Sequence, residues 1–171
     1  MAYLTSIWLT GIWEARTMDI YLFAVYLLAC GAAATTGALF SPGPWYRALA
    51  KPSWTPPDWL FPVAWTSLYV LMSAAAARVS LVDGAAYGLA LWSVQIAFNT
   101  LWTPIFFGLK RLRAAMVVMV GLWLSVAATT VAFFALDLWA GLMFLPYLVW
   151  VSVAGALNFW VMRNNSDPVA A

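Results

Sequence analysis

The strongest constraint on this fold is the distribution of charge along the chain. Only 8% of the 171 residues are charged, whereas a soluble domain has about 25%. The uncharged windows are residues 20–46, 59–77, 84–109, 114–136 and 138–162. Each is close to or longer than the ~20 residues that an α-helix needs to cross a bilayer. In lipid, only a helix satisfies its own backbone hydrogen bonds within one segment.

The sequence therefore predicts an all-α integral membrane protein, a bundle of five transmembrane helices. The expected helices cover about residues 20–40, 59–80, 84–107, 112–136 and 138–162. The first is expected to stop near Phe40, because the SPGP sequence that follows is typical of a turn. This helical domain would span residues 18–165 and be followed by a short tail at 166–171.

Residues 1–17 are interpreted as an N-terminal extension. They lack the cationic start of a signal peptide, and Glu14 and Arg16 interrupt their apolar run. Two interpretations stay open: the segment lies at the membrane interface, or it is not translated because synthesis starts at Met18.

The basic residues favour one orientation in the membrane. With five spans, one face of the membrane receives Arg47, Lys51, Lys110, Arg111, Arg113 and Arg163. The opposite face receives only Arg16 and Arg78. Because short cytoplasmic loops are enriched in Lys and Arg, the C-terminus is predicted to be cytoplasmic.

Composition argues against several functional classes. The chain has no histidine and one cysteine, Cys30, which excludes an internal disulfide and a haem held by an axial histidine and leaves no His/Cys ligand set for a zinc or iron–sulfur site. A net charge of +2 gives no indication of nucleic acid binding. No serine has a histidine or an intramembrane carboxylate to act as its base, so hydrolytic catalysis is not expected.

Polar and aromatic residues recur at helical spacing inside three of the expected helices. They are Phe61, Trp65 and Tyr69 on the second, Gln95, Asn99 and Phe106 on the third, and Tyr147, Trp150 and Ala154 on the fifth. Residues four apart share a helix face. The amides either join helices to one another or, with aromatic walls, line a ligand pocket; the combination favours the pocket.

Two further features carry open alternatives. Arg47 and Lys51 lie in the first loop near Trp54, where they either anchor the loop to anionic headgroups or form a lid whose cations meet carboxylates of a flat, apolar ligand. Gly84 and Gly88 form a GxxxG pattern, a weak indication of a homodimer face.

Five stretches of the chain share one resemblance. They are WYRALAKPSWTPPDW (45–59), FPVAWTSLY (61–69), QIAFNTLWTPIFFG (95–108), PYLVW (146–150) and ALNFWVMR (156–163). In order and spacing they resemble the TspO family of tryptophan-rich sensory proteins, also called translocator proteins or peripheral-type benzodiazepine receptors, in its bacterial form. The resemblance implies a five-helix bundle, often dimeric, with a pocket that opens toward the first loop.

The resemblance also implies ligands and pocket residues. The ligands are porphyrins such as protoporphyrin IX and isoquinoline carboxamides, with no obligatory cofactor. The family's pocket positions fall on Ala34, Trp65, Asn99, Trp150 and Ala154. The implied function is a tetrapyrrole-binding sensor, regulator or carrier in porphyrin metabolism and stress response.

Two alternatives to that function stay open. One is light- and oxygen-dependent porphyrin breakdown through Trp65 and Trp150, and the other is passive transport of porphyrins or sterol-like lipids. Animal members carry a cholesterol motif with a tyrosine where this chain has Phe159, which disfavours sterol recognition of that kind. The sequence does not decide between a bacterial inner and outer membrane.

Overall fold

The structure, a computed structural model, describes residues 18–168, and within them every regular element is helical. The elements are α2 (Ile20–Leu39), α3 (Pro44–Ala48), α4 (Leu60–Val79), α5 (Ala86–Thr103), the π-helical turn η1 (Pro104–Gly108), α6 (Leu112–Leu136) and α7 (Leu138–Asn164). The predicted all-α class is thus confirmed for the described part. The predictions for residues 1–17 and for 169–171 of the tail lie outside the described residues.

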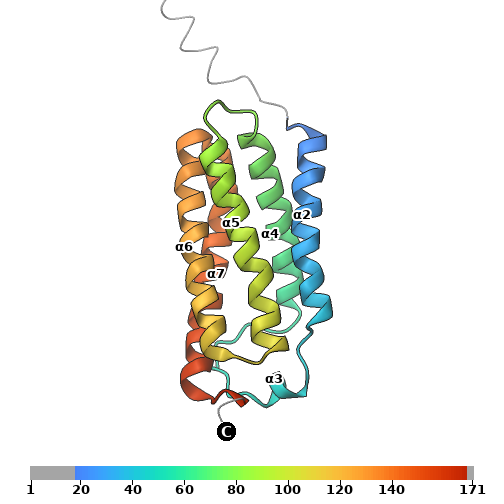
Figure 1. The fold of residues 1–171 in the computed structure, drawn as a ribbon, viewed down its shortest axis with the longest axis vertical. Coiled ribbons are helices and arrows are strands. Elements are labelled where there is room, and N and C mark those ends of the chain that lie inside the picture. The colour runs from blue at the N-terminus through green and yellow to red at the C-terminus, as the bar shows by residue number, and fades with distance from the viewer. Residues whose placement is uncertain (1–17, 169–171) are drawn as a thin grey trace, which may run out of the picture.

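The long helices run side by side, and α3 lies across one end of the bundle (Figure 1). Four of them, α2, α4, α6 and α7, are long and apolar enough to cross a membrane. The third predicted span is not among these four. Its helix, α5, has 18 residues and is shorter than the expected 84–107.

Proline explains where α5 ends. Pro104 has no backbone N–H, so it cannot continue the regular hydrogen-bonding pattern of the helix. The chain instead widens into η1, where the Leu109 N–H donates to the Pro104 carbonyl at 2.8 Å. A single π-helical turn of this kind rotates the residues that follow it out of register with those before it.

Helix α2 lies at an edge of the bundle, against α4 and α5 (Figure 1). Asp19 caps its first turn by accepting hydrogen bonds from the N–H groups of Tyr21 and Leu22. Only Cys30 and Ala33 are buried along it. This helix therefore contributes little to the core compared with α4 and α6.

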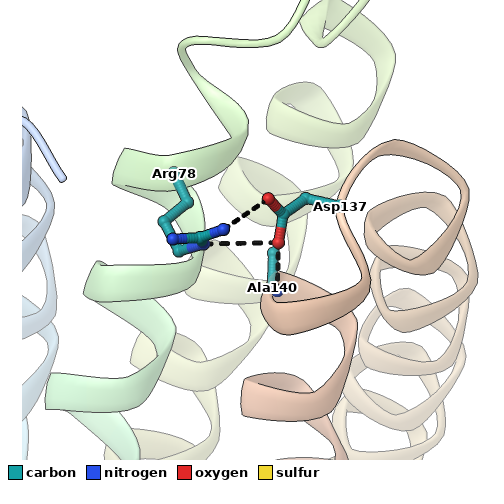
Figure 2. Close-up of polar contacts among 3 residues, drawn as sticks. All are labelled: Arg78, Asp137 and Ala140. Atoms are coloured by element: carbon teal, nitrogen blue, oxygen red, sulfur yellow. Dashed lines mark hydrogen bonds and ion pairs between the residues drawn. The ribbon is translucent and has the colours of Figure 1, made fainter. Parts of the chain in front are cut away.

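Asp137 alone separates α6 from α7. Its carboxylate caps α7 by accepting from the Ala140 N–H at 2.8 Å and pairs with the Arg78 guanidinium of α4 at 2.7 Å (Figure 2). Burial raises the pKa of this carboxyl, but the hydrogen bonds and positive charge of Arg78 and the backbone N–H of Ala140 outweigh burial and hold the pKa below its ordinary value. One side chain thus joins the ends of three helices.

The opposite end of the bundle is closed by the first loop and the C-terminal segment. The Asn165 amide both accepts from the Ala50 N–H and donates to the Ala50 carbonyl, at 2.9 and 3.1 Å. Asp167 accepts from the N–H of Leu112 at the start of α6. The segment after α7 is therefore tied to both the loop and α6.

The two glycines proposed as a dimer face lie in different surroundings within the chain. Gly84 lies in the turn before α5 with φ +80°, a backbone conformation that favours glycine. Gly88 is buried inside the bundle, where an added Cβ would lie 3.1 Å from Leu136 and 3.3 Å from Phe133 of α6. Gly88 therefore allows α5 to pack closely on α6 within one chain, and a homodimer face at Gly84 and Gly88 stays an untested prediction.

Candidate functional site

Four polar side chains form one hydrogen-bonded chain across three helices, here called the polar layer: Tyr69 of α4, Gln95 and Asn99 of α5, and Tyr147 of α7. The Tyr69 hydroxyl donates to Asn99 Oδ1, and Asn99 Nδ2 donates to the Tyr147 oxygen, both at 3.0 Å. The Tyr147 hydroxyl in turn donates to Gln95 Oε1 at 3.0 Å. Both amides and Tyr147 are buried, so the layer is shielded from surrounding solvent or lipid.

Aromatic rings pack against the polar layer on the side of α4 and α7. The Trp65 ring stacks on Tyr69 with centroids 5.4 Å apart and meets Tyr147 edge-on at 6.1 Å. One turn closer to the first loop, Phe61 meets Trp150 edge-on at 5.6 Å. The structure thus brings together seven of the predicted ligand-binding residues: Phe61, Trp65, Tyr69, Gln95, Asn99, Tyr147 and Trp150.

Phe106 belongs to a second group, here called the aromatic cluster: Trp45, Tyr46, Trp102, Phe106 and Phe107. The Phe106 ring stacks on Trp102 at 4.9 Å and meets Trp45 and Tyr46 of the first loop edge-on. The sequence placed Phe106 on nearly the same stripe as Gln95 and Asn99. Its buried ring packs under the first loop because Phe106 lies within η1, where the register of α5 is no longer kept.

Trp102 was missed by sequence reasoning. Its indole N–H donates to Asn158 Oδ1 at 3.0 Å, and Asn158 Nδ2 lies 3.4 Å from the Met116 sulfur. The sequence spacing could have identified Trp102, because residues 95, 99, 102 and 106 follow the four-and-three spacing of one helix face. Asn158 of α7 therefore links α5 and α6 to its own helix, as expected of an amide that joins helices to one another.

The cations of the first loop differ in their surroundings. Lys51 Nζ donates to the carbonyls of Tyr46, Leu49 and Arg47 at 2.7–3.3 Å and lies over the Tyr46 ring. It caps the C-terminal end of α3, where cations are favoured. Arg47 is exposed, and so is Trp54. Burial, with a further contribution from Asp58, raises the pKa of Tyr46 and keeps its phenol neutral.

The two small residues taken from the resemblance are placed differently. Ala154 of α7 is partly buried and packs against the main core. Ala34 of α2 is exposed, while its neighbour Ala33 is buried. The structure therefore brings Ala154 into the bundle and leaves Ala34 exposed on α2, four residues after the buried Cys30.

The chemistry available at this site is that of neutral groups. The windows that supply the polar layer and the rings around it contain no charged residue. Phenol and amide groups donate and accept hydrogen bonds, and indole and phenyl rings offer flat apolar faces. Such a combination suits binding of an apolar, planar molecule better than acid–base or nucleophilic chemistry.

Comparison with known proteins decides the family. The TspO/MBR family profile matches residues 22–163, which include all of the polar layer and the aromatic cluster. The chain belongs to the TspO/MBR family. With four apolar helices long enough to span, this membership identifies a multi-pass membrane protein.

TspO/MBR relatives come from bacteria and animals. The chain is 62% identical over 152 residues to Protein CrtK of Rhodobacter capsulatus, covering 86% of this chain and 95% of the relative. It is 57% identical over 148 residues to the tryptophan-rich sensory protein of Cereibacter sphaeroides, covering 86% and 94%. The human translocator protein is 36% identical over 126 residues, covering 71% of this chain and 75% of that one.

The TspO/MBR position that carries the cholesterol-motif tyrosine in animal members is Phe159 here. Its ring is half exposed on α7, and the Arg163 guanidinium lies 5.9 Å from the ring centroid. A cation over a ring face is favourable without a hydroxyl. The expectation that Phe159 disfavours sterol recognition of the animal kind stays untested.

Proposed function

We propose that the protein is a tetrapyrrole-binding membrane protein that holds protoporphyrin IX between α4, α5 and α7. In this role it acts as a sensor, regulator or carrier in porphyrin metabolism and stress response. One observation carries the proposal: a buried hydrogen-bonded layer, centred on Asn99, is flanked by the rings of Trp65 and Trp150.

The rings suit a macrocycle because aromatic faces and edges pair with planar π systems. Each such pair contributes about 0.5–1.5 kcal/mol beyond the burial of its apolar area. Phe61 and Trp150 lie on the first-loop side of Trp65 and Tyr69, so the aromatic surface extends toward the loop. The polar layer would fix the depth of the ligand, and the exposed Arg47 would meet its propionates at the loop.

The proposal includes five membrane spans. Helix α5 runs along the bundle, packed chiefly against α6 and α2 (Figure 1), and its polar side chains Gln95 and Asn99 are buried. A helix whose polar groups face the bundle can cross lipid although its mean hydropathy is lower. Counting α5 as a span places the two ends of the chain on opposite faces of the membrane.

The test is a titration of the detergent-solubilised protein with protoporphyrin IX, followed by quenching of tryptophan fluorescence. We expect the double variant Trp65→Phe, Trp150→Phe to weaken binding about tenfold or more, since ~1.4 kcal/mol corresponds to a factor of ten. The matched control is Trp139→Phe, because Trp139 lies exposed at the start of α7. Equal affinities of the double variant and the wild type would remove the pocket assignment.

A further inference from the structure

A groove of about 550 Å³ lies between α6 and α7 on the outside of the bundle. Its lining residues are Met116, Met119, Val120, Trp123 and Leu124 of α6 and Ser152, Gly155 and Ala156 of α7. Val120, Trp123 and Leu124 are exposed, so the groove is open to its surroundings. None of the lining residues belongs to the polar layer or to the aromatic cluster, so the groove is a different surface from the site described above.

The lining of the groove suits a hydrocarbon chain. Small side chains of α7 leave room there, since an added Cβ at Gly155 would meet only the Met119 side chain, at 3.6 Å. The Trp123 indole N–H donates to Ser152 Oγ at 2.8 Å, and the Ser152 hydroxyl donates to the Leu148 carbonyl at 2.8 Å. Because both donors are already used, an occupant meets mainly apolar surface.

Each of the two helix faces that line the groove ends at an arginine. Arg113 lies one turn before the first groove residue of α6, and Arg163 lies two turns after the last groove residue of α7; such spacings keep residues on one helix face. The two helix ends lie together, because Asp167 accepts from the Leu112 N–H. Both arginines are exposed, and neither pairs with a carboxylate in the described part of the chain.

The length of this surface matches one leaflet of a bilayer. Leu124 follows Arg113 by eleven residues, which is ~16 Å along a helix that rises ~1.5 Å per residue. Half of the ~30 Å hydrocarbon core is ~15 Å. An apolar groove of that length, with two cations at one end, has the same order of parts as a phospholipid.

We propose that this groove binds one phospholipid of the leaflet at the first-loop end, with an acyl chain along the groove and the phosphate between Arg113 and Arg163. Guanidinium groups bind phosphate oxygens through charge-assisted hydrogen bonds. A second copy of the chain fits less well. A twofold dimer through this face would bring four arginines to one level of the membrane, and like charges repel across an interface.

The test is native mass spectrometry of the detergent-solubilised protein during titration with dioleoyl phosphatidylglycerol. Dioleoylglycerol, which has the same chains and no phosphate, is titrated in parallel. We expect saturable binding of one phosphatidylglycerol per chain. Dioleoylglycerol should bind about tenfold more weakly, because it lacks the charge-assisted hydrogen bonds to arginine.

Two double variants test the headgroup contact. Arg113→Gln with Arg163→Gln should weaken binding of phosphatidylglycerol about tenfold, to the level of dioleoylglycerol. The matched control is Lys110→Gln with Arg111→Gln, which removes the same charge from the exposed turn before α6. This control should bind both lipids as wild type does.

A single substitution tests the chain contact. Ala156 is exposed in the groove, so Ala156→Leu fills part of it without entering the core. It should weaken binding of both lipids. Ala24→Leu, at an exposed position of α2, is the control and should weaken neither.

Three results would overturn the inference. They are equal affinity of wild type for the two lipids, equal affinity of the two double variants for phosphatidylglycerol, and equal affinity of Ala156→Leu and Ala24→Leu. A wild type that binds no lipid and forms a dimer that Ala156→Leu dissociates would also overturn it, because a second copy would then fill the groove. Titration with protoporphyrin IX should give wild-type values in every variant; failure of wild type to bind it would overturn the proposed function and leave the lipid result standing.

Discussion

Single amide groups in this protein differ in what their neighbours leave available. Asn158 accepts from the Trp102 indole and contacts the Met116 sulfur, so both ends of its amide are used between helices. Asn99 is likewise engaged by two tyrosines, whereas Gln95 keeps a free donor. Three residues of similar chemistry thus divide into two whose amides are fully engaged between helices and one that keeps an unpaired donor among the described residues.

Asp137 gives the clearest prediction at this scale. Replacing it with alanine removes the α7 cap and leaves the Arg78 guanidinium, only 19% exposed, without its carboxylate partner. We expect a loss of about 2–4 kcal/mol in the free energy of unfolding, measured by denaturant unfolding in detergent. Asp137→Asn keeps an acceptor for the Ala140 N–H and should lose less than half of that amount.

The same carboxylate predicts a pH dependence. Its pKa in the folded protein lies below the ordinary 3.8, so its contribution is full above the unfolded pKa and is lost as pH falls through the lower folded value. Wild type should therefore lose stability on acidification below about pH 4. The Asp137→Asn variant should show a shallower slope there, and identical slopes would contradict the assignment.

Between elements, glycine sets how closely helices approach. An added Cβ at Gly121 of α6 would lie 2.6 Å from the Phe98 ring of α5, while at Gly31 of α2 nothing lies within 4 Å. Gly121 thus lies at the close contact between α5 and α6. Gly31 lies in open space on α2, at the edge of the bundle.

Paired alanine substitutions test this difference. Gly121→Ala should lower the free energy of unfolding by about 1–3 kcal/mol, because Phe98 must shift in a packed interior. Gly31→Ala should be neutral or raise it by up to ~1 kcal/mol, since alanine favours the helix. Thermal unfolding in one detergent compares the two; a Gly121→Ala variant as stable as Gly31→Ala would show that the α5–α6 interface adapts freely.

Helix existence and helix faces could be predicted from the sequence, but partners across helices could not. Charged residues bound the window of α6, and the predicted 112–136 coincides with Leu112–Leu136. The end of α5 was placed too late because charge does not mark it; Pro104 does. The four-residue spacing predicts that Gln95 and Asn99 share one helix face. Only the tertiary arrangement reveals that the Asn99 amide is hydrogen-bonded to Tyr69 and Tyr147.

The whole molecule is asymmetric from end to end. One end carries the Arg78–Asp137 pair, and the other carries α3, the aromatic cluster and the C-terminal segment (Figures 1 and 2). Most of the basic residues lie at the second end, and the positive-inside rule predicts that this end is cytoplasmic. This orientation requires α5 to cross the membrane.

Cysteine labelling tests whether α5 crosses the membrane. In a Cys30→Ala background, Asp83→Cys and Leu109→Cys place single exposed thiols on either side of α5 and preserve every basic residue. We expect an impermeant maleimide to modify Asp83→Cys from the outer face of sealed vesicles and Leu109→Cys only in inverted ones. Modification of both from one face would show that α5 does not span.

The single-residue connection at Asp137 has a consequence for biogenesis. Helices α6 and α7 are 25 and 27 residues long, and the single residue between them holds their joined ends together. We expect them to enter the bilayer as one helical hairpin, after α2, α4 and α5 have left the ribosome. The polar layer, which needs Tyr147, therefore cannot form until α7 has joined the other helices.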